Sequence, residues 1–382
     1  MPHHNSVFHA VLKLLPWQVL DEAVERHAGA ERARSFSYKN QLVAMLYAQL
    51  SRSQSLRHVV AGLQSHANRL YHLGIEPARR STLADANRDR PAAVFAELLA
   101  MMIERTHRGL RQTMQGVTYV IDSTGLRLNQ LSADWAQFSA KACGMKLHVI
   151  YDPGAGCPIY AAITAARTND ITAAQAMPIQ PGATYVFDLG YYDYAWWAEL
   201  HAAGCRIVTR LKSNTPLTVT ETRPLERCGP ILSDHVGRLP QRQARNRKNP
   251  MSEPVREIQV RIQTGKVLRI VTNDLNAPAQ EIADLYKRRW AIELFFRWVK
   301  QTLKITRFLG TSENAVRIQV TVALIAFLLL RLAHKAQAAV SSPLEFVRLV
   351  AANLMHLRPL QHLHTPQPRP KDAPAQLNFL TP

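Results

Sequence analysis

The spacing of apolar residues changes once along this 382-residue chain, close to Gly116. Before that point, apolar side chains recur every three or four residues, which predicts helices. The clearest cases are NQLVAMLYAQLSRSQSLRHVVAGLQ (40–64) and AAVFAELLAMMIERTHRGL (92–110). After it come β-branched and aromatic runs bounded by Gly, Pro, Asn or Asp, which predict strands: VTYVID (117–122), KLHVIYD (146–152), IYAAIT (159–164), TYVFD (184–188) and CRIVTRLK (205–212). We therefore expect a helical region followed by a mixed α/β sheet.

Local breaks divide the chain further. The polar stretch RRSTLADANRDRP (79–91) predicts a break between helices, with Ser81 and Thr82 as caps. Residues 213–275 are basic and irregular, and end in two strand-like runs around a Thr-Gly turn. We expect five segments: a helical region (1–113), the first part of an α/β core (114–212), a β-rich insertion (213–275), the rest of the core with C-terminal helices (276–358) and a proline-rich tail (359–382).

The charge balance indicates the kind of partner. Lys and Arg number 47 against 28 Asp and Glu, which gives a net charge of +19. A surplus of this size favours a polyanion, with nucleic acid first and an anionic membrane second. The most apolar run, IQVTVALIAFLLL (318–330), is too short to span a bilayer and predicts a buried core helix, so we expect no membrane contact. The basic residues of the helical region fit either a DNA-binding module or solvated helix faces.

Cysteine use and the start of the chain suggest a compartment. The four cysteines are far apart and form no Cys-x-x-Cys pair, which argues against a zinc knuckle or a disulfide scaffold. No hydrophobic stretch of the secretory kind opens the chain. We therefore expect a reducing compartment, the cytoplasm.

Two aspartates follow apolar strands directly. Asp122 ends VTYVID and Asp188 ends TYVFD, each before a predicted turn. Because functional crevices in open α/β sheets lie at the carboxyl ends of strands, these two acids could be neighbours in space. Each could also be an ordinary turn or N-cap residue.

The segment YKRRWAIELFFRWVK (286–300) contains a third acid on a basic, apolar helix. At about 100° per residue, Tyr286, Arg289, Glu293 and Lys300 fall within an arc of roughly 60° and share one face. One interpretation is a helix ion pair of Glu293 with Arg289 or Arg297. The other interpretation is that Asp122, Asp188 and Glu293 come together in one site.

Three converging carboxylates need a cation between them, and hard oxygen ligands suit Mg²⁺ or Mn²⁺. Two such ions can activate a water or a 3′-hydroxyl and stabilise the leaving oxygen in a displacement at phosphorus. Asp122, Asp188 and Glu293 would be the ligands, while the basic and tyrosine side chains of the helix face would hold phosphate oxygens.

The spacing Tyr-x2-Arg-x3-Glu-x6-Lys from Tyr286 to Lys300 resembles the YREK signature of a group of bacterial insertion-sequence DDE transposases. Asp122 in IDSTG and Asp188 in FDLGYYD resemble the first two catalytic motifs of that group. GMKLHVIYD (144–152) and TND (168–170) are similar to the segments between those motifs. The resemblance covers residues 116–335.

The resemblance implies an RNase H-like catalytic core with a β-rich insertion, preceded by an all-helical DNA-binding region. Such an enzyme binds the terminal inverted repeats of its element as double-stranded DNA, cleaves the ends with two Mg²⁺ or Mn²⁺ ions and joins the 3′-hydroxyls to target DNA. It acts as a homodimer, here expected at the bacterial nucleoid. Arg210 and Lys212 fit either end-DNA contacts or a solvated strand end. The alternatives are a nuclease without strand transfer and a catalytically silent DNA-binding repressor.

Overall fold

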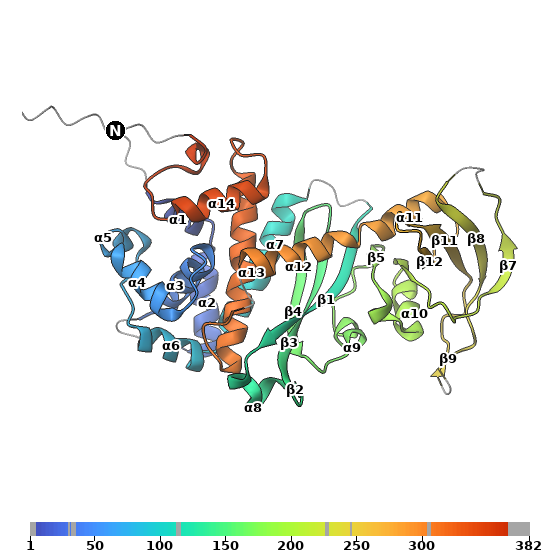
Figure 1. Cartoon of the computed structure of the whole chain (residues 1–382), viewed down its shortest axis with the longest axis horizontal. Coiled ribbons are helices and arrows are strands. Elements are labelled where there is room, and N and C mark those ends of the chain that lie inside the picture. The colour runs from blue at the N-terminus through green and yellow to red at the C-terminus, as the bar shows by residue number, and fades with distance from the viewer. Residues whose placement is uncertain are drawn as a thin grey trace, which may run out of the picture.

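The computed structural model describes residues 5–29, 31, 36–111, 116–225, 229–244, 247–303 and 307–365, without the side chains of residues 243 and 244. Most of the predicted tail, residues 366–382, lies outside this range. Along the longest axis, helices occupy one end of the molecule, a large sheet occupies the middle, and insertion strands occupy the other end (Figure 1). A long helix, α13 (Glu313–Lys335), stands between the helical end and the sheet.

The N-terminal third is helical, as its periodicity predicts. Its elements are α1 (Val7–Leu12), α2 (Trp17–Ala28), α3 (Tyr38–Leu50), α4 (Leu56–Ser65), α5 (Ala67–Leu70), the 3-10 turn η1 (Tyr71–Leu73), α6 (Arg80–Asp89) and α7 (Ala92–Leu110). The expected break at residues 79–91 is wrong, because most of that stretch forms α6. Its buried face explains why: Leu83 packs into the core, and Asn87 accepts a hydrogen bond of 2.8 Å from Gln41 of α3. Ser81 and Thr82 therefore lie inside this helix.

The core sheet begins directly after this region. Its strands are β1 (Thr118–Leu128), β2 (Gln137–Ser139), β3 (Ala142–Asp152), β4 (Cys157–Ala165), β5 (Thr184–Val186) and β6 (Arg206–Arg210). The order across this part is β4-β3-β1-β5-β6, with β2 also pairing with β3. β3 is antiparallel to both β1 and β4, whereas β5 is parallel to both β1 and β6.

The insertion extends this same sheet. It contains β7 (Thr218–Thr222), β8 (Ile231–Arg238), β11 (Val255–Arg261) and β12 (Val267–Thr272), with β9 (Arg242–Ala244) and β10 (Arg247–Lys248) as a separate pair. β12 pairs antiparallel with β6, and β11, β8 and β7 follow outward. A buried ion pair from Arg256 on β11 to Asp234 on β8, with N–O distances of 2.8 and 2.6 Å, ties the added strands together.

Helices cover both faces of the core sheet. The remaining ones are α8 (Ala133–Ala136), α9 (Asp170–Gln175), α10 (Tyr194–Ala202), α11 (Ala279–Lys287), α12 (Trp290–Thr302) and α14 (Pro343–Asn353), with the turns η2 (Gln130–Ser132), η3 (Leu189–Tyr191) and η4 (Leu360–His362). One hydrophobic core joins the N-terminal helices, one face of β1 and helices α11–α14. A second core, rich in Tyr and Trp, lies on the other face with α10.

The helix expected over residues 286–300 is divided between two helices. α11 ends at Lys287 and α12 begins at Trp290, because Arg289 and Ile292 bond to carbonyls three residues earlier and tighten the turn locally. The two helices share a buried apolar stripe that packs into the core. Its members are Leu285, Ile292, Phe296, Val299 and Leu303.

α13 contains the most apolar run and is the predicted core helix. By length and composition it could cross a membrane, yet 83% of its most apolar 18-residue window is buried inside the protein. It packs against α3, α6 and α7 from the helical region. Of the cysteines, Cys143, Cys157 and Cys205 are buried and free, and Cys228 lies outside the described residues.

Candidate active site

Asp122 lies in the middle of β1, so the expected strand end is wrong at this position. β1 continues to Leu128 because it pairs with β3 as far as Cys143, through the predicted turn. On its other side, β1 pairs with β5 at Thr118–Val120. Asp122 therefore lies just past the end of the β5 pairing, and its Oδ1 accepts a hydrogen bond of 2.8 Å from Ser123 N–H.

Asp188 follows β5 and does lie at a strand end. Its side chain caps the 3-10 turn η3, where Oδ1 accepts a hydrogen bond of 2.8 Å from Gly190 N–H. The N-cap interpretation is therefore correct for one oxygen of this carboxylate. A cap does not exclude a second role, because a carboxylate has further acceptor positions.

Arg289 joins the helix face to β1. Its guanidinium donates to Asp122 Oδ2 at 3.4 Å and also to Glu293 on α12. Of the two ion pairs open to Glu293, the pair with Arg289 is formed, whereas Arg297 stacks on the Trp290 ring at 5.9 Å. The structure thus brings two of the three predicted acids to one guanidinium.

The charge on Asp122 is poorly compensated. Burial raises its pKa most, the Ser123 N–H lowers it, and the charges of Asp188 and Glu293 raise it further against the effect of Arg289. The result is a pKa of about 6, against an ordinary 3.8. Asp188 is therefore within electrostatic reach of Asp122, and the site has more negative charge than one arginine balances.

The other predicted residues lie at different distances from these acids. Tyr286 is buried, which raises its pKa, and it is within reach of Arg289, Arg210 and Asp188. Arg210, at the end of β6, thus belongs near the site, and its buried Nε has no hydrogen-bond partner among the described residues. The ammonium of Lys212 lies 4.5 Å from the Tyr192 ring centroid.

Lys300 lies two turns beyond Glu293 on α12. Burial lowers its pKa below the usual lysine range, and the nearby positive charge of Arg127 lowers it further. A lysine that is destabilised in this way by both burial and a like charge favours an anion beside it.

A fourth acid, Asp170, was not among the predicted site residues. It accepts hydrogen bonds from Ser123 Oγ at 2.7 Å and from Lys146 Nζ at 3.1 Å. A Cβ placed on Gly190 would lie 3.0 Å from Asp188 Oδ1 and 3.3 Å from Asp170 Oδ2, so both acids flank this glycine. The TND motif contained the signal, but an Asp in the first turn of a helix has an ordinary explanation.

Hard oxygen ligands are present at the site. Within the described part of the chain, no group of three or more His, Cys, Asp or Glu side chains is arranged to hold a metal ion. The donor set still fits a divalent cation, because half-buried Asp122 retains uncompensated charge near two further carboxylates. Metal binding by all three acids stays a prediction.

Comparison with known proteins gives the family. Residues 114–329 match the model described as "Transposase DDE domain", and residues 3–76 match "Domain of unknown function (DUF4372)". A Sinorhizobium fredii protein named as a transposase, y4zB, is 38% identical over 315 residues, which is 80% of this chain and 87% of that protein. A Geobacillus stearothermophilus protein named as a transposase for the insertion sequence element IS5377 is 29% identical over 87% of this chain and 85% of its own length.

The chain has a mixed α/β sheet with acids beside a basic helix face, and residues 114–329 of it match the family model. The protein belongs to the DDE transposase family. Among solved structures, a piggyBac transposase synaptic complex with hairpin DNA is 11% identical, with a TM-score of 0.46 over 96% of this chain and 83% of that one. At that TM-score the likeness supports no further argument.

Proposed function

We propose that this protein is an insertion-sequence transposase of the YREK-signature group. It binds the terminal inverted repeats of its element, cleaves the ends by metal-dependent hydrolysis and joins the 3′-hydroxyls to target DNA. The observation that carries the proposal is the Arg289 guanidinium, which contacts both Asp122 and Glu293. Acids separated by most of the core sequence thus share one cation on the helix face that carries the signature.

We also propose that the core is RNase H-like. The strand order β4-β3-β1-β5-β6 supports this, with three antiparallel strands followed by two that run parallel to β1. In this arrangement the first acid is on the central strand, the second follows the adjacent parallel strand, and the third is on a helix packed across β1. The insertion between the second and third acids then continues the sheet outward.

Asp122, Asp188 and Glu293 would hold the Mg²⁺ or Mn²⁺ ions. The ions would supply activation of a water or a 3′-hydroxyl and stabilisation of the leaving oxygen. The deficit of positive charge at Asp122 supports cation binding, because an added cation would offset the burial and like-charge effects on this carboxylate.

The basic side chains of the helix face would orient the DNA. Arg289 has a planar guanidinium that faces both acids, so it can bind a phosphate that approaches them. Lys300 would hold a second phosphate, and the Tyr286 hydroxyl could donate to another. Arg210 is near this group through Tyr286 and would make an end-DNA contact, whereas Lys212 would contact DNA farther out. A cytoplasmic homodimer that pairs two element ends completes the proposal.

Replacing Glu293 by Gln tests the proposal. The full-length protein is given Mg²⁺ and a labelled duplex from the DNA that flanks its gene, and binding, nicking and joining are measured separately. We expect Glu293→Gln to reduce cleavage by at least about a hundredfold, since disturbing the support of a metal site already costs 10–100-fold. End binding should persist. Glu313→Gln removes another helix ion pair at four-residue spacing, with Arg317, and serves as the control.

Equal loss of binding and cleavage in Glu293→Gln would identify a structural salt bridge instead. Cleavage by the wild type without joining would favour the nuclease, and binding without any cleavage in Mg²⁺ or Mn²⁺ would favour the repressor.

A further inference from the structure

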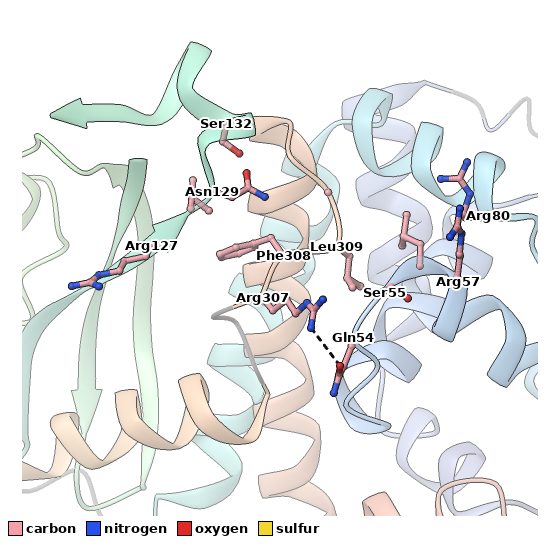
Figure 2. Close-up of a pocket in the computed structure, with 13 residues that line it drawn as sticks. Gln54, Ser55, Arg57, Arg80, Arg127, Asn129, Ser132, Arg307, Phe308 and Leu309 are labelled. Carbon is pink, nitrogen blue, oxygen red and sulfur yellow. Dashed lines mark hydrogen bonds between the residues drawn. The ribbon is translucent and has the colours of Figure 1, made fainter. Parts of the chain in front are cut away.

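A basic groove of about 570 Å³ lies between the helical region and the core sheet. Four arginines line it, each from a different segment: Arg57 on α4, Arg80 on α6, Arg127 on β1 and Arg307 just before α13. Figure 2 shows Arg57 and Arg80 on the helical wall, Arg127 on the strand wall, and Arg307 between them, donating to Gln54 at 3.4 Å. We call this site the arginine groove.

The positive charge of the arginine groove is not balanced within the described residues. No acid lines the groove, and none of its four arginines takes part in an ion pair there. Elsewhere, arginines such as Arg256, Arg269 and Arg289 pair closely with carboxylates. Four like charges on facing walls repel one another, and an anion placed between them would remove that cost.

Two helices begin at the groove and add to its positive potential. α4 is capped by Ser55, which lines the groove, and α6 begins at Arg80. The free N–H groups and positive dipole end of a helix N-terminus favour phosphate oxygens. The planar guanidinium groups beside these termini suit the same ligand.

The walls of the groove are held in place by buried and cross-region hydrogen bonds. Buried Gln319 of α13 accepts from Leu309 N–H at 2.8 Å and donates to the Arg307 carbonyl at 3.0 Å. Asn314 accepts from Ala92 N–H at 3.1 Å and donates to the Asn87 carbonyl, also at 3.1 Å, which holds the α6–α7 junction on α13. The arginine groove is therefore preformed, which limits the entropy lost on binding.

Strand β1 connects the groove to the candidate active site, because it carries both Asp122 and Arg127. Glu293 and Lys300 are about 10 Å apart along α12, at 1.5 Å per residue. Lys300 is close enough to Arg127 to feel its charge, and Arg127 lines the groove. Phosphates of one DNA strand advance by about 3.4 Å each, so roughly three nucleotides cover the step from Glu293 to Lys300.

We propose that the arginine groove binds the phosphodiester backbone of the element-end DNA as it leaves the carboxylate site past Lys300. The ligand is a phosphodiester in either case, and the end duplex is favoured over target DNA because the groove joins the helical region directly to that site. This inference rests on the proposed function for the identity of the DNA. It adds the path of the DNA and the four side chains that hold it.

The test is the double variant Arg57→Gln/Arg80→Gln in the full-length protein. Its matched control is Arg105→Gln/Arg348→Gln, which removes two exposed helix arginines that do not line the groove. Affinity for an element-end duplex is measured at several salt concentrations. We expect the groove variant to lose at least about tenfold in affinity and its salt slope to fall by about two, one for each phosphate contact. The affinity and salt slope of the control should match those of the wild type, and neither variant should unfold at a lower temperature than the wild type.

Equal affinities and slopes for the groove variant and the control would overturn the inference. So would a loss confined to a duplex of unrelated sequence, because that would assign the groove to target DNA. Cleavage of the same end duplex by the wild type is measured separately, so that the two proposals are tested independently. If the wild type cuts and joins DNA while both variants bind it equally well, the groove proposal is refuted and the transposase proposal is retained. A wild type that never cuts refutes the proposed function, while the salt slopes still decide the groove.

Discussion

Asp122 and Asp152 lie on paired strands, β1 and β3, and burial raises the pKa of both, yet their net pKa shifts are opposite. Asp152, with 1% of its side chain exposed, accepts from His107 Nε2 at 2.9 Å, from Arg111 and from two backbone N–H groups. These partners outweigh burial and lower its pKa. Asp122, with 18% exposed, has one backbone donor and a shared arginine, and its pKa rises to about 6.

The difference separates a carboxylate that has enough donors within the protein from one that has too few. At Asp152 the protein itself supplies enough donors, from α7, from its C-cap residue Arg111 and from the turn after β3. The charge therefore contributes to the contact between the helical region and the sheet. At Asp122 two other acids are near, and the guanidinium of Arg289 is shared between Asp122 and Glu293. Such a deficit is costly in the free protein, and a bound divalent cation would remove it.

The largest expected effect is at Asp152. We expect Asp152→Asn to lower the free energy of unfolding by about 3–5 kcal/mol, because it leaves a buried guanidinium without its carboxylate. Chemical denaturation at pH 7.5 measures this, with Glu104→Gln as control, an exposed pair with Arg108 on the same helix. Because folding lowers the pKa of Asp152, its contribution is present above the unfolded pKa and is lost as pH falls through the folded value. If Asp152→Asn lowers the free energy of unfolding no more than Glu104→Gln does, the contrast between Asp152 and Asp122 is refuted.

The opposite sign is expected at Asp122. Folding raises its pKa from 3.8 to about 6, so the charged form opposes folding above pH 6 and the cost disappears below about pH 4. Asp122→Asn should therefore raise the free energy of unfolding at pH 8 in metal-free buffer, by at most about 3 kcal/mol. The gain should shrink as pH falls from 6 to 4. A variant less stable than the wild type at pH 8 would show that the pair with Arg289 outweighs burial.

Magnesium should act on one aspartate and not on the other. A ligand at tenfold its Kd stabilises the folded state by about 1.4 kcal/mol. We expect Mg²⁺ to raise the melting temperature of the wild type and of Asp152→Asn by similar amounts, and to leave Asp122→Asn unchanged. Ca²⁺ at the same ionic strength is the control, because it screens charge equally but is the larger ion. A Mg²⁺ shift that survives in Asp122→Asn would place the ion elsewhere.

The sequence predicted features that depend on local spacing. The period of 3.6 residues gave α7 with its bounds at Ala92 and Leu110, and it put Arg289 and Glu293 on one face, where they are in contact. Strand propensity found β3, β4, β11 and β12. These patterns are reliable because a helix or strand must bury one face wherever it packs.

Features that depend on pairing between distant segments were not predictable in this way. The turn-like STG after Asp122 remains strand because β3 pairs alongside it, and the insertion joins the core because β12 pairs with β6. Asp170 and the arginine groove arise from segments far apart in sequence, each with an ordinary local explanation. Nothing in the spacing of Arg57, Arg80, Arg127 and Arg307 indicates that they meet.

The smallest expected effect concerns which neighbouring charge raises the pKa of Asp122 more. The charge of Asp188 raises the pKa of Asp122 more than that of Glu293 does, and Glu293 is already paired with Arg289. Asp188→Asn should therefore move the pH midpoint of the Asp122-dependent stability change to lower pH. Glu293→Gln should move it less, because the charge of Glu293 has the smaller effect on Asp122. The midpoint is read from unfolding free energies of each variant with and without Asp122→Asn between pH 4 and 8. A larger shift in Glu293→Gln would mean that Arg289 controls the charge of Asp122, so that the site would depend on the guanidinium more than on the distance between its acids.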